Sequence, residues 1–154
     1  MKLILVSGLS GSGKSIALNV LEDAGYYCVD NLPATLLLDV VHFLEDAGQS
    51  RAAVSVDARS AALSALPETV ARLKSQGIDC RVLFLDASRE SLVRRFSETR
   101  RRHPLTGGGL TLAEAIDEER AMLAGAAGIG HHIDTSDLLP KALRDWIRAL
   151  LEIG

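Results

Sequence analysis

The sequence predicts an α/β fold in which a five-stranded parallel sheet carries helices on both faces. Short apolar runs alternate with longer segments of helical periodicity, which is the pattern of parallel strands joined by crossover helices. The first apolar run also leads directly into a glycine-rich loop, which a helical segment follows. A chain of 154 residues, 47% of them hydrophobic, fits one domain with a substantial core.

Each expected strand is a short aliphatic run, and the expected helices lie between these runs. We expect strands at residues 2–7, 26–29, 52–57, 81–86 and 131–134. We expect helices at residues 14–24, 34–47, 61–76, 88–100, 112–124 and 137–152. The carboxyl ends of the strands then share one edge of the sheet, where open α/β folds bind their ligands.

The loop after the first strand has the spacing G-x-x-x-x-G-K-S, formed by Gly8, Gly13, Lys14 and Ser15. Glycines let the backbone N–H groups approach phosphate oxygens, and the start of the next helix adds its positive dipole end. In this motif Lys14 reaches the β- and γ-phosphates, and the Ser15 hydroxyl binds Mg²⁺. The sequence therefore predicts a P-loop NTPase with a site for a nucleotide and Mg²⁺. The predicted site comprises Gly8, Leu9, Ser10, Gly11, Ser12, Gly13, Lys14 and Ser15.

Three expected strands end at an aspartate on the edge of the sheet where this loop lies. Asp57, at the end of AAVSVD, is the first candidate for the carboxylate that orders Mg²⁺ and its water beside the phosphates. Asp30 is the second candidate, as a residue that orients Mg²⁺, water or an acceptor hydroxyl. Together with Lys14, Asp57 and Asp30 are the predicted catalytic residues. Asp86 precedes an expected helix, and it fits an ordinary N-terminal cap region equally well.

Positive charge is concentrated in one segment. The chain has a net charge of −3, yet residues 89–103 contain six arginines and two glutamates. In kinase-like folds, arginines on a closing lid neutralise charge that develops on a transferred phosphoryl group, and we expect this role for Arg100, Arg101 and Arg102. The spacing does not place all six arginines on one helix face, so a solvated basic helix is the alternative. We assign His103 to the same basic segment.

Composition restricts the remaining functions. Aromatic residues make up 4% of the chain, so any contact with RNA depends on charge and not on base stacking. Cys28 and Cys80 have no C-x-x-C spacing, which indicates reduced thiols in the cytoplasm. No apolar segment approaches 18 residues, so we expect no membrane-spanning helix.

Several further motifs occur in a characteristic order: VSGLSGSGKSIALNVLEDAGYYCVDNLP, VDARS, LFLDASRESLVRRFSETRRRHPL and DTSDL. With them the chain resembles, over essentially its whole length, the nucleotide-binding domain of the RapZ family of RNase adapter proteins. The resemblance implies slow hydrolysis of ATP and GTP. It also implies that GTP contacts a segment of four residues, Asp57, Ala58, Arg59 and Ser60, the last of which is often Asn in relatives.

The same resemblance implies partners for the full-length protein. Well-studied members bind a small regulatory RNA, present it to RNase E, and thereby control synthesis of glucosamine-6-phosphate. Members also self-associate and carry a second, C-terminal domain, so we expect residues 1–154 to be the N-terminal domain of a longer protein.

Two other functional classes share these parts. A phosphate loop, aspartates at the strand ends and an arginine-rich lid are also found in nucleoside-monophosphate and sugar kinases. In that alternative, Asp30 binds the acceptor hydroxyl. A catalytically idle interaction module, which keeps the fold without the chemistry, is the third interpretation.

Overall fold

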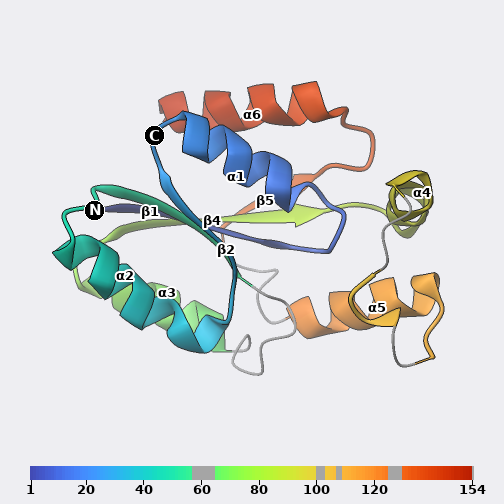
Figure 1. Cartoon of the computed structure of the whole chain (residues 1–154), viewed down its shortest axis with the longest axis horizontal. Coiled ribbons are helices and arrows are strands. Elements are labelled where there is room, and N and C mark those ends of the chain that lie inside the picture. Colours follow the sequence, from blue (N-terminus) through green and yellow to red (C-terminus); the bar gives the residue numbers. More distant parts are fainter. Residues whose placement is uncertain (57–64, 100–102, 107–108, 125–129, 154) are drawn as a thin grey trace.

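Five parallel strands form a single sheet in the centre of the molecule (Figure 1). The structure is a computed structural model, and the residues it describes are 1–56, 65–99, 103–106, 109–124 and 130–153. The strands are β1 (Lys2–Gly8), β2 (Tyr27–Leu32), β3 (Arg51–Val56), β4 (Asp79–Asp86) and β5 (His131–Asp134). Their order in the sheet is β2-β3-β1-β4-β5, which confirms the predicted five-stranded α/β fold.

The strand β1 lies in the middle of the sheet, with β3 paired on one side and β4 on the other. Its side chains alternate between the two faces: Leu3 and Leu5 belong to one core cluster, and Ile4 and Val6 belong to the other. All four side chains are buried. Burial on both faces is typical of a parallel sheet that helices cover on each side. The strand therefore delivers the glycine-rich loop to the middle of the carboxyl edge.

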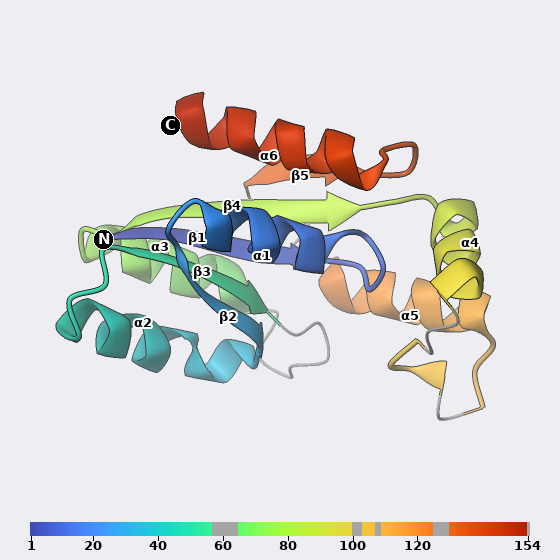
Figure 2. The same cartoon turned by 45° about the horizontal axis from the view of Figure 1, so that its top comes forward.

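Helices cover both faces of the sheet (Figures 1 and 2). They are α1 (Lys14–Asp23), α2 (Leu37–Asp46), α3 (Leu66–Ser75), α4 (Arg89–Thr99), α5 (Leu112–Leu123) and α6 (Pro140–Ile153), with a short 3₁₀ helix, η1 (Ala34–Leu36), before α2. On one face lie α1 and α6, and on the other lie α2 and α3. Figure 2 shows α4 and α5 at the end of the sheet toward which the strands point. Within the described residues, no helix is both long and apolar enough to cross a membrane.

Two of the differences in extent between the expected and the observed elements concern β2 and α3. The strand β2 continues to Leu32, three residues beyond its predicted end, because an irregularity interrupts it without ending it. Its register against β3 shifts between Val29 and Leu32, and Asn31 has a φ of 52° there, a conformation that asparagine tolerates better than most residues. The helix α3 begins at Leu66, and residues 61–64 of the predicted helix lie outside the described residues.

Both cysteines are free thiols, as the sequence predicts. Burial raises the pKa of the Cys80 thiol to about 11, and burial together with the nearby carboxylate of Glu22 raises the pKa of Cys28 to about 11. Since the thiolate is the reactive form, these raised pKa values disfavour reaction of either cysteine at neutral pH.

Candidate phosphate-binding site

The loop that follows β1 approaches the end of β4 so closely that its first residue has to be glycine. Gly8 has a φ of 143°, and a Cβ atom there would lie 2.1 Å from the carbonyl oxygen of Leu85. The amide of the next residue, Leu9, donates a hydrogen bond to that same oxygen at 3.2 Å. The backbone of β4 thus fixes the position at which the loop leaves the sheet.

Hydrogen bonds between buried residues of the loop itself also stabilise its conformation. The Ser12 side chain is fully buried, and its hydroxyl donates to the carbonyl oxygen of Leu9 at 2.5 Å. The Ser12 amide donates to the same oxygen at 3.0 Å. Leu9 itself is 1% exposed and packs in the core cluster beside Leu5 and Leu92. The loop conformation therefore depends on its own buried residues and on the sheet below it.

The helix α1 begins at Lys14 directly after Gly13, which has a φ of 111° at the N-cap position. No side chain caps this helix, and its first turn contains no acidic residue. Lys14 is partly buried and Ser15 is exposed. A helix start of this kind favours an anion, because its first amides and its dipole present partial positive charge.

Arg95 of α4 forms a hydrogen bond with a backbone carbonyl oxygen of the loop. One of its Nη atoms donates to the carbonyl oxygen of Gly11 at 3.0 Å and to the Thr135 hydroxyl at 3.1 Å, and the other Nη donates to the Thr135 carbonyl oxygen. Thr135 is 1% exposed, and its hydroxyl donates to the carbonyl oxygen of Ser12 at 2.7 Å. Burial lowers the pKa of Arg95 from its ordinary value. Arg95 and Thr135 together fix two successive loop carbonyls.

Glu119 of α5 contacts the loop directly. Its Oε1 atom accepts a hydrogen bond from the Ser10 amide at 2.6 Å, and its Oε2 atom accepts one from the Ser10 hydroxyl at 2.5 Å. The Nε2 atom of His103 lies 3.2 Å from Oε1. Glu119 and His103 are only 3% and 2% exposed, so a buried polar pair joins α5 to the loop.

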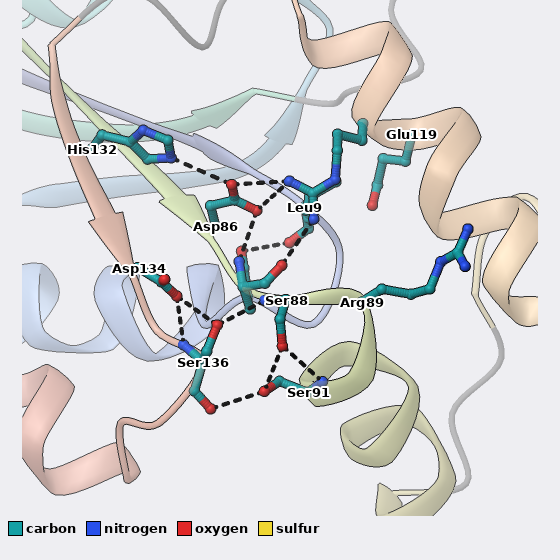
Figure 3. A network of polar contacts seen from close by, with 12 residues as sticks. Leu9, Asp86, Ser88, Arg89, Ser91, Glu119, His132, Asp134 and Ser136 are labelled. Carbon is teal, nitrogen blue, oxygen red and sulfur yellow. Dashed lines mark hydrogen bonds and ion pairs between the residues drawn. The ribbon is translucent and has the colours of Figure 1, made fainter.

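Neighbouring groups donate hydrogen bonds to the carboxylate of Asp86, at the end of β4 (Figure 3). Arg120 of α5 donates to both of its carboxylate oxygens at 2.8 and 2.9 Å, and the Ala87 amide donates to Oδ1 at 2.8 Å. The Nε2 atom of His132 lies 3.5 Å from Oδ2. These contacts occupy the carboxylate and argue against a role as a ligand of Mg²⁺. In the cap region that follows, the Ser88 hydroxyl accepts the Ser91 amide of α4 at 3.2 Å.

Asp30 lies at the same edge of the sheet but two strands away from the loop, because β3 separates β2 from β1. The Ser55 hydroxyl donates to its Oδ1 atom at 2.6 Å, and the Asn31 amide donates to the Ser55 hydroxyl at 2.8 Å. Asp30 is exposed, so one side of its carboxylate is held in place while the rest faces solvent.

The remaining predicted site residues lie outside the described residues. These are Asp57, Ala58, Arg59, Ser60, Arg100, Arg101 and Arg102. The strand that precedes Asp57 does lie directly beside β1, as expected for the carboxylate of a P-loop site. Within the part of the chain that the structure describes, no group of three or more His, Cys, Asp or Glu side chains is arranged to hold a metal ion. The predicted magnesium site therefore stays a prediction.

Comparison with known proteins assigns the chain to a family. The RapZ-like N-terminal domain family matches residues 1–153. The chain belongs to this RapZ-like family. A nucleotide-binding protein from Chromobacterium violaceum is 58% identical over 153 residues, which cover 99% of this chain and 55% of that protein. One from Methylobacillus flagellatus is 55% identical over 148 residues, which cover 96% and 53%. The chain thus spans about half the length of the curated relatives it matches.

Solved structures with the same fold include several kinases. A sugar kinase from Janibacter aligns with a TM-score of 0.67 at 17% identity, covering 100% of this chain and 96% of the kinase. Shikimate kinase from Bacteroides thetaiotaomicron aligns with a TM-score of 0.60 at 14% identity, covering 98% and 97%. The YorR protein of Bacillus subtilis, in complex with phosphorylated GDP, aligns with a TM-score of 0.64 at 16% identity, covering 98% and 96%. At these identities the similarity establishes a kinase-like P-loop fold.

The environment of one residue that we assigned from the sequence differs from our expectation. His103, which we assigned to the basic segment, is buried against Glu119. Glu119 itself carried a signal that the sequence analysis missed. It stands three residues after Ile116 and four before Leu123, so it occupies a position in the apolar face of α5. A carboxylate in such a stripe needs a buried partner, which here is the loop.

We predict that Arg95→Ala destabilises the RapZ-like domain by about 2 kcal/mol, since hydrogen bonds from charged donors each contribute about 1.5–3 kcal/mol. Urea unfolding measures this loss in the free energy of unfolding, provided that the m-value is the same in parent and variant. Arg94→Ala is the matched control, because Arg94 is exposed and donates a hydrogen bond to the Ser91 hydroxyl of its own helix at 3.3 Å. That control should change stability by less than about 0.5 kcal/mol. Equal losses in the two variants would contradict the role assigned to Arg95.

Proposed function

We propose that this chain is a nucleotide-binding domain whose loop at residues 8–15 binds the phosphate chain of ATP or GTP. The geometry of the loop carries the proposal: Gly8 is pressed against β4, and α1 starts uncapped at Lys14. Relatives at 55% and 58% identity are named nucleotide-binding proteins, and a structure with the same fold holds phosphorylated GDP. These observations favour nucleotide as the ligand over a free phosphate or sulfate.

Each loop residue has a defined task in this proposal. The backbone amides of the loop and the ammonium group of Lys14 bind phosphate oxygens. The exposed Ser15 hydroxyl is one ligand of Mg²⁺, an ion that prefers oxygen donors and keeps several waters. When bound, the ion offsets phosphate charge. Asp57, the first residue after β3, orders its water, and the segment of residues 57–60 contacts GTP.

Slow hydrolysis is assigned to three residues. Lys14 stabilises charge on the transferred phosphoryl group. Asp57 acts through the water around the ion. Asp30 orients the attacking water, and the Ser55 hydroxyl fixes one of its oxygens for that purpose. Asp86 takes no part, because Arg120 and the Ala87 amide occupy its carboxylate.

For the full-length protein, the RapZ resemblance supports a regulatory role. In this proposal residues 1–154 form the N-terminal domain of an RNase adapter protein that binds a small regulatory RNA and presents it to RNase E. The output is control of glucosamine-6-phosphate synthesis. Arg100, Arg101 and Arg102 contact nucleotide phosphate or RNA by charge. We also propose that the full-length protein forms a homo-oligomer in the cytoplasm.

A small-molecule kinase is the second candidate function. The observation that favours it is the fold shared with a sugar kinase and with shikimate kinase. Under this alternative, Asp30 accepts the proton of an acceptor hydroxyl, and the arginines close over the transferred group. The two candidates differ in one respect that can be measured, since a kinase requires an acceptor and a switch does not.

We predict that Lys14→Ala weakens binding of Mg-ATP and Mg-GTP by about 10- to 100-fold, because a charged donor to phosphate contributes about 1.5–3 kcal/mol. Isothermal titration measures the affinity, and thermal unfolding checks that the domain still folds. Lys74→Ala, an exposed lysine on α3, is the control and should bind as the parent does. If Lys14→Ala bound nucleotide as tightly as the parent, the assignment of the loop would be wrong.

We predict that ATP turnover by this chain is slow and unchanged by shikimate, gluconate or nucleoside monophosphates. The switch proposal requires no acceptor pocket, so saturating concentrations of these compounds should leave the rate of ADP release the same. Stimulation of more than about tenfold, equivalent to about 1.4 kcal/mol of barrier, would favour the kinase instead.

We predict that replacing Arg100, Arg101 and Arg102 with Ala in the full-length protein weakens RNA retention and flattens its salt dependence. Each phosphate contact that is lost reduces the slope of log K against log salt by about 0.7 to 0.9. Filter binding across a series of salt concentrations gives that slope. A weaker affinity at an unchanged slope would contradict direct contacts between these arginines and RNA.

A further inference from the structure

A carboxylate occupies one of the amides of the candidate phosphate loop. Both oxygens of Glu119 accept hydrogen bonds from Ser10, one from its amide and one from its hydroxyl. Ser10 lies between Gly8 and Gly13, inside the stretch whose backbone is expected to cradle phosphate. The contact joins residues 109 positions apart in the chain, so it arises from the tertiary fold and not from a local turn.

His103 completes the surroundings of this carboxylate. The Leu105 amide donates to the Nδ1 atom of His103 at 3.1 Å, which makes Nδ1 an acceptor and leaves the ring proton on Nε2. That proton points to Oε1 of Glu119 at 3.2 Å. The carboxylate therefore receives three hydrogen bonds in a buried position, which satisfies it without a positively charged partner within the pair.

His103 also organises the turn that follows the arginine cluster. Its carbonyl oxygen accepts the Thr106 amide at 3.1 Å and the Thr106 hydroxyl at 2.7 Å. Its ring lies 5.2 Å from that of Phe96 on α4. The segment His103–Thr106 is thus linked through Glu119 to Ser10 of the loop, and it directly follows Arg100, Arg101 and Arg102 in the chain.

We propose that Glu119 is an internal competitor for phosphate, which nucleotide binding displaces from Ser10. Two anions cannot share the partly buried Ser10 amide without strong repulsion, because Glu119 is buried and the dielectric around it is low. Release of Glu119 removes the acceptor of His103 and loosens the turn at residues 103–106. Occupancy of the loop is thereby coupled to the segment beside the arginine cluster. This inference rests on the proposed function and specifies how the same site is regulated.

Other contacts keep α5 in place when Glu119 leaves the loop. Arg120 holds Asp86 and the carbonyl oxygen of Ala87, and Asp117 pairs with Arg89. Ile116 and Leu123 are buried in the core cluster. The change is therefore confined to the Glu119 side chain and the His103 turn, and it does not require the helix to unfold.

Glu119→Gln tests the competition with a side chain of the same shape and no charge. We expect it to bind the Mg²⁺ complex of a non-hydrolysable ATP analogue at least about fivefold more tightly than the parent, the lower end of typical coupling between sites. Glu118→Gln is the matched control, because it removes the same charge from an exposed neighbour on α5. It should stay within about twofold of the parent, since isolated exposed charges contribute little. Equal or weaker binding by Glu119→Gln, relative to Glu118→Gln, overturns the inference.

Hydrogen exchange provides a second readout that does not depend on affinity. In the parent, saturating analogue should speed amide exchange at His103, Leu105 and Thr106, and Glu119→Ala should show that faster exchange without analogue. Slower or unchanged exchange at these residues on binding overturns the coupling. The Lys14→Ala variant distinguishes failure of this inference from failure of the proposed function. If the parent binds and Lys14→Ala does not, while Glu119→Gln equals the parent, the inference fails and the proposed function stands. If neither the parent nor Glu119→Gln binds nucleotide, both fail.

Discussion

The close approach of Gly8 to the carbonyl oxygen of Leu85 is the constraint on which the site depends. A side chain at position 8 would collide with β4, whereas glycine lets the loop leave the sheet between β1 and β4. The Leu9 amide then bonds to the same carbonyl, and Leu9 enters the core. From this anchor the chain turns back to start α1 at Lys14, so the helix start faces the carboxyl edge of the sheet.

The carbonyl oxygens of the loop and the donors of Ser10 have different kinds of hydrogen-bond partner. Arg95 and Thr135 bind the carbonyl oxygens of Gly11 and Ser12, and these contacts come from α4 and from the residue after β5. At Ser10, by contrast, both the amide and the hydroxyl donate to a carboxylate from α5. Fixed carbonyls preserve the shape of the loop, while the anionic acceptor at Ser10 is the group that, in our proposal, phosphate replaces. Rigidity and exchange are thus assigned to different residues of one short loop.

Much of the fold and part of the site could be predicted from the sequence, for identifiable reasons. Aliphatic runs mark the strands, and the G-x-x-x-x-G-K-S spacing is local, so the strands and the candidate loop from Gly8 to Ser15 could be named from the sequence, while phosphate binding by that loop stays a prediction. Contacts between distant elements were not predictable. Arg95 was one arginine among six, and only the packing of α4 against Thr135 distinguishes it. His103 follows three arginines and was therefore assigned to the basic segment, yet its ring is buried against Glu119 and lies beside Phe96.

A crystal structure of this chain with Mg²⁺ and a non-hydrolysable nucleoside triphosphate tests the central claim most directly. The account predicts phosphate oxygens within hydrogen-bonding distance of the amides at the start of α1, with Lys14 beside them and Glu119 no longer bonded to Ser10. Phosphates bound away from residues 8–15 would contradict the assignment of the site. Phosphates in the loop with both Glu119–Ser10 hydrogen bonds intact would contradict the competition between the two anions.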